Sequence, residues 1–318
     1  MTVLVTGITG FVGSHLAKAL VDRGYEVVGI VRDAKPRTVL SCLGYDKKVT
    51  LVRGDVLDLN LVLRVLAEYD VDFVYHLAAA STVGAAKRSP ITALETNALG
   101  TATVLEACRI NGSVKCVVAS SDKVYGYQPE MLPYTEETPL KPVNVYDASK
   151  ACADMMARVY HRVYGLPVAV TRFCNIYGFD LNTSRLVPSV IISVLRGERP
   201  VIRSDGMQVR EYMYIEDCVD AYLRVMERFE HFEGKAVNVG TGEKYAVLEV
   251  VDKILSLMNA EVEPIILNQA RDEIKAQYMV SEVFKVAARW RPRYTMDEGL
   301  KLTIDEYKKH GWLYGKGA

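Results

Sequence analysis

Two side chains with the spacing of a catalytic pair, Tyr146 and Lys150, lie in the segment Tyr-Asp-Ala-Ser-Lys. Residues four apart share one face of a helix, so the phenol and the ammonium group can act on the same molecule. Lowering the pKa of a phenol from about 10 to about 7 requires about 4 kcal/mol, and a neighbouring ammonium supplies part of this. The pair therefore indicates a base that removes a hydroxyl proton. Because most such pairs on a protein surface are incidental, the surrounding sequence must decide whether this pair is catalytic.

A glycine-rich segment close to the amino terminus, Thr6-Gly7-Ile8-Thr9-Gly10-Phe11-Val12-Gly13, stands between an apolar run and an amphipathic segment. Glycines at such a place allow a tight turn, close approach of the backbone to a pyrophosphate and close packing of the next helix. An ordinary glycine turn is the alternative, but the position between a strand and a helix favours dinucleotide binding. Beside a nicotinamide ring, Tyr146 would remove a hydroxyl proton as hydride leaves the same carbon.

The end of the second apolar run bears on which dinucleotide is bound. An acidic residue that would grip the adenosine ribose is expected at position 31, where the chain has Val31, followed by Arg32 and Asp33. Arg32, with Lys35 and Arg37 nearby, can pair with a 2′-phosphate, which favours NADP over NAD. Two alternatives stay open: these are solvated loop charges, or Asp33 reaches the ribose.

Short runs rich in Val, Ile and Leu alternate with amphipathic segments, which is typical of parallel strands covered on both faces. We predict strands at 3–6, 26–31, 49–53, 71–77, 115–120 and 167–173, and helices at 12–23, 59–68, 91–110 and 147–164. This alternation predicts an α/β fold with a Rossmann-type doubly wound parallel sheet. Residues 1–174, with a return strand near 236–240, would form the dinucleotide-binding domain, and residues 175–318 mainly a smaller substrate-binding lobe.

The composition excludes several classes of partner. Lys plus Arg and Asp plus Glu both total 39, so no overall charge attracts nucleic acid or a membrane surface. We find neither a targeting segment nor a long apolar run and expect a cytoplasmic protein. Six scattered cysteines without a C-x-x-C pair indicate reduced thiols, and five histidines without H-x-x-x-H spacing give no reason to expect a metal.

Taken together, these segments resemble the extended short-chain dehydrogenase/reductases, in the group of nucleotide-sugar epimerases and dehydratases. The resemblance covers nearly the whole chain. Besides the glycine-rich segment and Tyr146 with Lys150, it rests on His76-Leu77-Ala78-Ala79, Asn97-Ala98-Leu99-Gly100-Thr101, Ser120-Ser121, Thr171-Arg172-Phe173-Cys174-Asn175, Arg210-Glu211-Tyr212-Met213-Tyr214-Ile215-Glu216-Asp217 and Asn238-Val239-Gly240-Thr241-Gly242.

The resemblance implies a set of site residues. Cofactor-binding residues would be Gly7, Gly10, Phe11, Val12, Gly13, Arg32, Asp33, Asp55, Val56, Leu77, Ala78, Ala79 and Asn97, together with Tyr146 and Lys150. Substrate-binding residues would be Ser81, Asn175, Arg185, Leu186, Arg210 and Arg271, with Asn175, Arg185 and Arg210 on the nucleotide diphosphate. Ser121 would bind the reacting sugar hydroxyl.

Within this group the residues beside Ser121 distinguish reactions, and here they are Asp122 and Lys123. Epimerases of the group usually carry small or neutral residues there. The Asp-Lys pair most resembles CDP-glucose 4,6-dehydratases and, among others, GDP-mannose 4,6-dehydratases. Segment 185–188 is similar to the first of these, whereas segment 210–217 looks more like that of epimerases.

A 4,6-dehydratase oxidises C4 to a ketone, which acidifies the C5 proton and permits loss of the C6 hydroxyl, and hydride then returns to C6. Asp122 would protonate the departing hydroxyl and Lys123 would take the C5 proton. Lys123 must be neutral for this, and crowding by Lys150 and the oxidised nicotinamide favours that form. The alternative is a structural pair.

Other functions stay open at this point. A 4-epimerase or a 4-keto-6-deoxy sugar reductase would use the same Tyr146 and cofactor without elimination. A dinucleotide-binding protein without enzymatic activity is disfavoured, because it has no need for Ser121, Tyr146 and Lys150 together.

The two long predicted helices, 91–110 and 147–164, carry more apolar surface than one face of a sheet needs. The residues concerned are Leu94, Leu105, Met155, Met156, Val159 and Val163. The resemblance implies a homodimer formed by these helices, and ordinary core residues are the alternative.

Overall fold

The computed structural model describes residues 1–128, 131–269 and 274–315. In this part of the chain the main sheet has seven strands in the order β10-β6-β5-β4-β1-β2-β3, all parallel to their neighbours. The strands are β1 (Thr2–Thr6), β2 (Glu26–Val31), β3 (Thr50–Arg53), β4 (Val71–His76), β5 (Lys115–Ser121), β6 (Val168–Phe173) and β10 (Ala236–Val239). The order reverses between β1 and β4, so their carboxyl ends border the crevice where doubly wound folds bind ligands. The predicted α/β fold with a Rossmann-type sheet is confirmed.

Helices cover both faces of this sheet, because its strands carry apolar side chains on both sides. They are α1 (Phe11–Asp22), α2 (Val39–Cys42) and α9 (Ile215–Glu227) on one face, and α3 (Leu59–Glu68), α6 (Gly100–Ile110) and α7 (Val145–Tyr164) on the other. In β1 the alternation is direct: Val3 and Val5 belong to the first core and Leu4 to the second. The strands predicted from the sequence end within two residues of those observed.

One predicted helix is irregular. Residues 91–110 were expected to form a single helix, but the structure has α5 (Pro90–Leu94), a π-helical turn η1 (Glu95–Leu99) and then α6. Such turns hold one extra residue and often occur near functional sites. Here the turn contains Asn97, whose side chain is only 1% exposed. Another short helix, α4 (Val83–Arg88), precedes this region.

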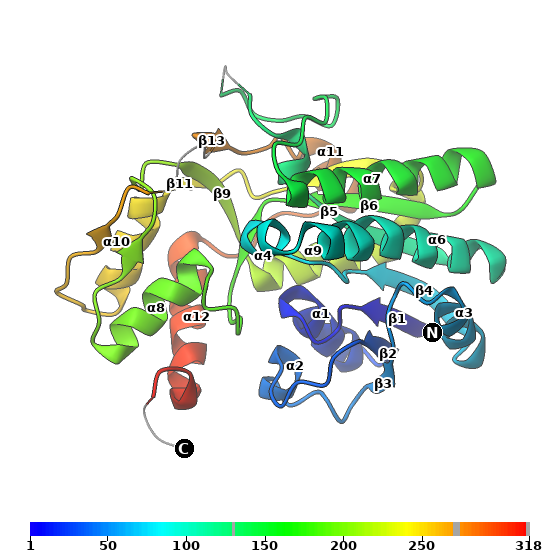
Figure 1. Ribbon diagram of the computed structural model, residues 1–318, viewed down its shortest axis with the longest axis horizontal. Coiled ribbons are helices and arrows are strands. Elements are labelled where there is room, and N and C mark those ends of the chain that lie inside the picture. The colour runs from blue at the N-terminus through cyan, green and yellow to red at the C-terminus, as the bar shows by residue number, and fades with distance from the viewer. Residues whose placement is uncertain (129–130, 270–273, 316–318) are drawn as a thin grey trace.

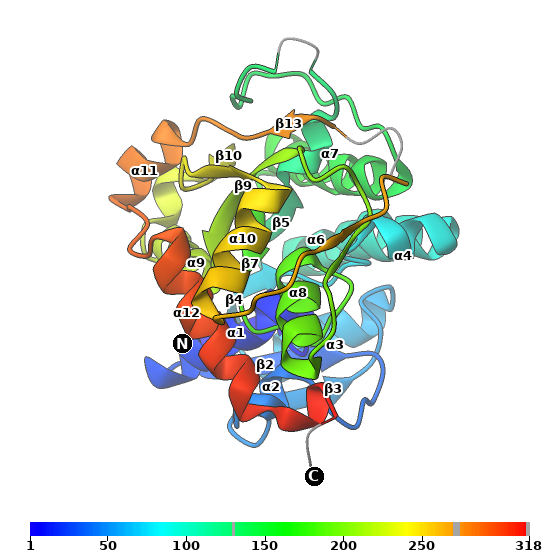
Figure 2. The same ribbon diagram turned by 90° about the vertical axis from the view of Figure 1, so that its left-hand side faces the viewer.

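Most of the C-terminal elements gather at one end of the main sheet, on the left in Figure 1. Strands β7 (Asn175–Tyr177), β9 (Val209–Tyr214), β11 (Lys244–Ala246) and β13 (Ala276–Gln277) form a second sheet, β8 (Val201–Ile202) pairs with β12 (Ile265–Ile266), and the helical elements of this lobe are α8 (Leu186–Arg196), α10 (Val247–Leu257), α12 (Met296–Lys309) and η4 (Gly311–Leu313). By contrast, η3 (Phe229–His231) follows α9, and α11 (Glu282–Ala288) packs against β10 of the main sheet. Figure 2 views this lobe from its outer side, with α10 and α12 in front. The carboxyl ends of β5 and β6 therefore face the lobe.

A buried ion pair joins α7 to the sheet. Arg172 of β6 is 2% exposed and donates from Nε and Nη2 to the carboxylate of Asp154 at 2.8 and 2.9 Å. Its Nη1 donates to the hydroxyl of Tyr125 at 2.8 Å, and that hydroxyl donates to Asn238 of β10 at 2.6 Å. Removing one member of a buried charge pair of this kind costs about 3–5 kcal/mol, so the link holds Tyr125 firmly.

The turn between β1 and α1 is as tight as the sequence indicates. Gly7 has φ +71°, and a Cβ on it would lie 2.8 Å from the backbone nitrogen of Ala78. A Cβ on Gly13 would lie 2.3 Å from the carbonyl oxygen of Gly7. Since backbone cannot yield as a side chain end can, α1 packs on this turn only with glycine at both positions.

We predict that Gly13→Ala weakens dinucleotide binding roughly tenfold or more, because relieving an overpacked contact costs about 1–3 kcal/mol and displaces the start of α1. Fluorescence titration with NAD(P)H measures the affinity. Gly84→Ala is the matched control, because its Cβ would meet nothing closer than Arg88 Nη1 at 3.8 Å. Equal affinity of the Gly13 variant and this control would contradict the prediction.

Candidate active site

Tyr146 and Lys150 lie in the first turns of α7, which Asn144 caps by accepting a hydrogen bond from the backbone nitrogen of Asp147 at 3.1 Å. Both side chains are buried and line one cavity. Lys150 Nζ donates to the carbonyl oxygen of Ala119 at 2.5 Å, and burial lowers the pKa of Lys150 to about 8. The lysine is thus fixed beside β5.

The pKa of Tyr146 moves in the opposite direction to the one that its predicted role as a base requires. Burial, followed by the negative charge of Asp122, raises the pKa of Tyr146 to about 12. Arg185 and a hydrogen bond with Ser121 act in the opposite direction but are weaker. The surrounding protein groups therefore keep Tyr146 protonated near neutral pH.

Ser121, Asp122 and Lys123 stand where β5 ends and the 3-10 turn η2 (Asp122–Tyr125) begins. Ser121 Oγ donates to Asp122 Oδ1 at 2.9 Å, and Lys123 Nζ lies 3.3 Å from the same oxygen. Asp122 is fully buried, whereas the side chain of Lys123 is 25% exposed. The three residues thus form one hydrogen-bonded group whose lysine faces the cavity.

Residues of the C-terminal lobe hold this lysine from the other side. Lys123 Nζ donates to Asn175 Oδ1 at 3.1 Å and to Gln277 Oε1 at 3.5 Å, and Gln277 Nε2 donates to the carbonyl oxygen of Asp122 at 3.3 Å. The sequence associated Asn175 with a diphosphate, but here it contacts Lys123. Gln277 was missed, since no motif marks it. Figure 2 shows its strand β13 passing above α7.

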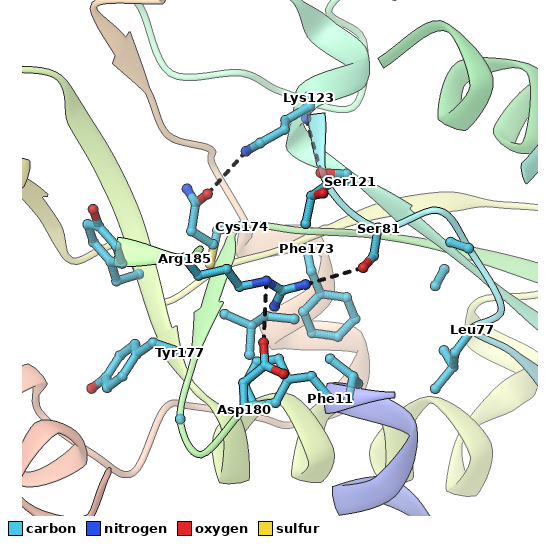
Figure 3. A pocket seen from close by; sticks show the side chains of 18 of the residues that line it. Phe11, Leu77, Ser81, Ser121, Lys123, Phe173, Cys174, Tyr177, Asp180 and Arg185 are labelled. Carbon is cyan, nitrogen blue, oxygen red and sulfur yellow. Dashed lines mark hydrogen bonds and ion pairs between the residues drawn. The ribbon is translucent and has the colours of Figure 1, made fainter. Parts of the chain in front are cut away.

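Arg185 lies on the opposite wall, at the N-cap of α8. Its Nε is 3.4 Å from Asp180 Oδ2, its Nη2 donates to Ser81 Oγ at 3.4 Å, and its guanidinium lies 5.4 Å from the centre of the Phe11 ring. Figure 3 shows Arg185 reaching between Asp180 and Ser81, with Lys123 and Ser121 on the far side of the cavity. Asp180 was not anticipated from the sequence.

Two adjoining cavities run along the carboxyl edge of the main sheet. The first, of about 390 Å³, is lined by the predicted residues Phe11, Val12, Leu77, Ala79, Ser81, Ser121, Lys123, Tyr146, Lys150, Asn175, Arg185 and Leu186, among others. The second, of about 270 Å³, is lined by Gly7, Gly10, Phe11, Val12, Gly13, Arg32, Asp33, Asp55, Val56, Leu77, Ala78, Ala79, Ser81 and Arg185, among others. Because they share lining residues, one elongated molecule can extend through both.

The second cavity suits a dinucleotide. Gly7, Gly10 and Gly13 of the tight turn line it, so main chain without side chains forms this part of its wall. Helix α1 begins at the same turn, and the backbone amides at its amino terminus favour binding of a pyrophosphate. Arg32, Asp33 and Asp55 line the same cavity, near the ends of β2 and β3.

Three predicted residues, Asp122, Asn97 and Arg210, line neither cavity. Asn97 is buried and donates to Ser149 Oγ at 2.8 Å, while its Oδ1 accepts from the backbone nitrogen of Ala80 at 2.7 Å. Arg210 lies on β9 and donates to the carbonyl oxygen of Val209, outside both cavity linings. Arg271 lies outside the described residues.

A buried histidine orders the loop that passes beneath both cavities. Burial lowers the pKa of His76 to about 3, so the ring is neutral. Thr6 Oγ1 lies 2.9 Å from its Nδ1 and accepts from the backbone nitrogens of Leu77 and Ala78, both at 3.1 Å. His76 Nε2 lies 3.0 Å from Thr101 Oγ1. The network fixes the backbone of Leu77 and Ala78 at the cavity floor.

Two kinds of feature are absent from the described residues. They contain no set of three or more His, Cys, Asp or Glu side chains placed to hold a metal ion. Among them, too, no helix combines the length and the apolar character that crossing a membrane requires.

Curated relatives match nearly the whole length of this chain. It is 32% identical to dTDP-glucose 4,6-dehydratase of Xanthomonas campestris pv. campestris (strain B100), over 99% of this chain and 95% of that protein. It is also 32% identical to a trifunctional UDP-glucose 4,6-dehydratase/UDP-4-keto-6-deoxy-D-glucose 3,5-epimerase/UDP-4-keto-L-rhamnose-reductase of Arabidopsis thaliana, over 98% of this chain. The chain spans about half of that larger relative, 48% of its length.

Solved structures are similar to this chain over nearly its whole length. UDP-glucose 4-epimerase of Thermotoga maritima, with UDP-glucose, superposes with a TM-score of 0.91 at 27% identity, covering 98% of this chain and 99% of that one. The dTDP-glucose 4,6-dehydratase DesIV of Streptomyces venezuelae, with NAD and TYD bound, superposes with a TM-score of 0.89 at 30% identity, covering 98% of both chains. The sequence pattern of the NAD dependent epimerase/dehydratase family matches residues 3–240. The chain belongs to the NAD dependent epimerase/dehydratase family.

Proposed function

We propose that the protein is a nucleotide-sugar 4,6-dehydratase that uses NAD(P). The observation that carries this proposal is the hydrogen-bonded group of Ser121, Asp122 and Lys123 beside the cavity that Tyr146 lines. Oxidation at C4 needs a base at the C4 hydroxyl, and elimination needs a further acid and base nearby. Relatives named as dTDP-glucose 4,6-dehydratases support the same conclusion.

Bound in the second cavity, NAD(P) would supply hydride transfer from C4 to C6 and a positive ring that favours the phenolate. Tyr146 removes the proton of the C4 hydroxyl while Ser121 holds that hydroxyl by a hydrogen bond. Lys150 stabilises the phenolate, and its pKa of about 8 keeps it charged at neutral pH. The high pKa of Tyr146 in the protein alone means that ionisation is confined to the loaded site.

The elimination step falls to Asp122 and Lys123. The C5–H bond breaks toward Lys123 Nζ, its electrons form the C5–C6 double bond, and the C6 hydroxyl leaves as water with a proton from Asp122. Transfer of one proton from Lys123 to Asp122 Oδ1, 3.3 Å away, prepares both groups at once. After elimination Lys123 returns a proton to C5. The pair then holds one proton fewer than at the start and Tyr146 holds one more, so return of that proton from Tyr146 to the pair through solvent completes the cycle.

The remaining predicted residues would hold the rest of the substrate. Arg185, Ser81 and Leu186 line the cavity and suit the diphosphate, for which an arginine fork is well adapted. Asn175 would position Lys123 through the hydrogen bond at 3.1 Å. We retain Arg210 and Arg271 as proposed contacts of the nucleotide.

A 4-epimerase is the second candidate, because UDP-glucose 4-epimerase of Thermotoga maritima has the same fold over nearly the whole chain. An epimerase also needs Ser121, Tyr146 and Lys150. It has no use for an acid and a base at C6 and C5, which is why the group around Lys123 favours the dehydratase.

We predict that Lys123→Ala lowers the rate of water loss by roughly a hundredfold or more, as expected for removal of a general base, while C4 oxidation persists. Mass spectrometry of CDP-, GDP-, UDP- and dTDP-hexose products, with solvent deuterium at C5, measures the elimination. Absorbance at 340 nm in a single turnover follows C4 oxidation.

The matched control is Lys115→Ala, an exposed lysine at the other end of the same strand. Full dehydratase turnover by the Lys123 variant would exclude its role as base. Epimerised products of unchanged mass from the wild type would instead select the second candidate.

We also propose that NADP is preferred over NAD. No carboxylate ends β2 at Val31, and Arg32 and Lys35 line the dinucleotide cavity. Arg32 pairs with Asp33 at 3.0 Å, but both side chains are more than half exposed, so the pair is weak and can open for a 2′-phosphate. Arg37 does not line this cavity, and its guanidinium lies 4.3 Å from the centre of the Trp312 ring.

Arg32→Ala should raise the Michaelis constant for NADP roughly tenfold, the loss of one charge-assisted phosphate contact of about 1.5 kcal/mol, and leave that for NAD unchanged. Steady-state kinetics with both cofactors checks this. Arg37→Ala serves as the comparison and should change neither constant. A wild type that strongly prefers NAD would refute the assignment, and the bound NAD of the DesIV structure makes the comparison informative.

Finally, we propose a homodimer in the cytoplasm. Six unpaired cysteines favour a reducing compartment. Met155, Val159 and Val163 form a stripe along α7 and are 46%, 47% and 61% exposed. Leu94 and Leu99, in the segment just before α6, are also exposed. Two predicted members of this face differ: Leu105 is fully buried and Met156 half-buried, because they pack in the core beneath.

Val159→Glu should dissociate the dimer, because a carboxylate at the centre of an apolar interface loses its hydration. Sedimentation velocity at low micromolar concentration distinguishes the states. Glu and Asp substitutions of exposed Val283, which lies on α11, should leave the assembly intact. A wild type that sediments only as a monomer would reject the proposal.

A further inference from the structure

Asp180, in the loop after β7, is a buried acidic residue in the wall of the first cavity, and the proposed chemistry gives it no role. It is 5% exposed. Its Oδ1 accepts a hydrogen bond from the backbone nitrogen of Asn182 at 3.1 Å. Its Oδ2 is buried and accepts no hydrogen bond within the described residues, and Arg185 Nε lies 3.4 Å from it. A buried carboxylate oxygen in this state is costly and calls for an explanation.

The main chain of Asp180 is held by α12 and, through the preceding residue, by α1. The hydroxyl of Tyr307, a fully buried residue of α12, accepts from the backbone nitrogen of Asp180 at 3.1 Å and donates to its carbonyl oxygen at 2.5 Å. The carbonyl oxygen of Phe179 lies 3.1 Å from Nε2 of His15 on α1, and the Phe179 ring packs against that of Tyr307 with 5.1 Å between centres. The backbone that carries the carboxylate is therefore fixed from two sides.

Arg185 is held less tightly than Asp180. Its Nε lies 3.4 Å from Asp180 Oδ2 and its Nη2 donates to Ser81 Oγ at 3.4 Å. Both distances exceed the usual length of an N–H···O hydrogen bond, about 2.7–3.2 Å. Figure 3 shows the arginine side chain extended between these two neighbours, with the Asp180 carboxylate directed at Nε. Asp180 therefore orients the guanidinium, which can still exchange its contact with Ser81 for a ligand.

The position of this contact on the guanidinium determines which donors are left for a ligand. A guanidinium has two edges with paired donors, one formed by Nε and Nη2 and the other by Nη1 and Nη2. With a carboxylate at Nε, the edge of Nη1 and Nη2 remains for an anion, and two parallel bonds from such an edge suit a phosphate. Because Arg185 lines both cavities, an anion bound at this edge lies close to their junction.

We propose that Asp180 is a positioning residue, which holds Arg185 through Nε so that the edge of Nη1 and Nη2 is presented to the diphosphate of the nucleotide sugar. This inference rests on the proposed function, in which Arg185 binds that diphosphate. An arginine without a fixed partner must be ordered when its ligand binds, and this lowers affinity. A carboxylate alone would repel the diphosphate, but the charge of Asp180 is offset by Arg185 within the pair, so orientation outweighs repulsion.

Asp180→Asn tests the proposal with little change of shape. The amide oxygen can accept from Asn182 as Oδ1 does, but the amide nitrogen, in place of Oδ2, cannot accept from Arg185 Nε. Calorimetry should show that the dissociation constant rises roughly tenfold for whichever of CDP, GDP, UDP and dTDP the wild type binds most tightly. The Michaelis constant of the corresponding nucleotide hexose should rise by a similar factor. The value of kcat should not change, because Ser121 and Lys123 lie on the far side of the cavity.

A double-mutant cycle determines whether Asp180 acts through Arg185. Arg185→Ala should weaken diphosphate binding, and Asp180→Asn should cause no further loss in that background. An equal loss in both backgrounds would overturn the proposal, and so would tighter binding by Asp180→Asn alone, which marks a merely repulsive charge. The matched control is Asp217→Asn, a fully buried carboxylate 3.9 Å from Arg293 Nε that lines neither cavity, and it should bind the diphosphates like the wild type.

A second variant keeps the proposal testable if the melting temperature shows that Asp180→Asn does not fold. Arg185→Lys keeps the positive charge but lacks the planar fork that Asp180 orients. It should bind the diphosphate roughly tenfold more weakly than the wild type. Affinity equal to that of the wild type would mean that charge alone suffices, and the proposal would be wrong.

Diphosphate binding without turnover separates this inference from the proposed function. If the wild type eliminates no water from any hexose but Asp180→Asn weakens diphosphate binding only when Arg185 is present, the dehydratase proposal fails and the positioning role stands. If elimination occurs and Asp180→Asn binds the diphosphate like the wild type, the positioning role fails alone.

Discussion

The central constraint on this molecule is the burial of charge at the carboxyl edge of β5. Asp122 is fully buried and Lys150 nearly so, and each is held by a specific partner: Ser121 and Lys123 for the carboxylate, the Ala119 carbonyl for the lysine. Charges removed from water cost free energy unless such partners replace the lost hydration. The same burial shifts the pKa of Lys150 down and that of Tyr146 up, so the scaffold determines which proton can move.

Charged side chains can act only if the turn that carries them is rigid, and a second buried network supplies that rigidity. Tyr125 closes η2, and its hydroxyl lies between Arg172 of β6 and Asn238 of β10. Its ring stacks on that of Tyr134 with 4.8 Å between centres. The Arg172 and Asp154 pair anchors this assembly on α7. The helix that carries Tyr146 and the turn that carries Lys123 are therefore held by the same buried network, which fixes the distance between them.

The sequence was sufficient for the scaffold, and its short motifs marked residues that line the two cavities, whose roles stay predictions. Apolar runs and glycine spacing located the strands of the sheet, and Gly7, Gly13, Ser121, Tyr146 and Lys150 line the cavities as expected. Asn97 shows the limit of prediction from a motif. The motif marks it as a cofactor-binding residue, but in the structure its side chain forms hydrogen bonds with Ala80 and Ser149. A motif states that a residue is needed and leaves open whether it touches a ligand or supports one that does.

Contacts between segments far apart in the chain could not be predicted, and these complete the site. Gln277 reaches Lys123 and the Asp122 carbonyl across 154 and 155 residues, and no local pattern distinguishes it from any other glutamine. Because β13 and β7 supply Gln277 and Asn175, the C-terminal lobe holds the amine of Lys123 as well as forming a wall of the cavity. A substrate that engages Lys123 must exchange these hydrogen bonds for its own. In the proposed mechanism, substrate binding and preparation of Lys123 as the base are then one event, which couples the lobe to the chemistry at the end of β5.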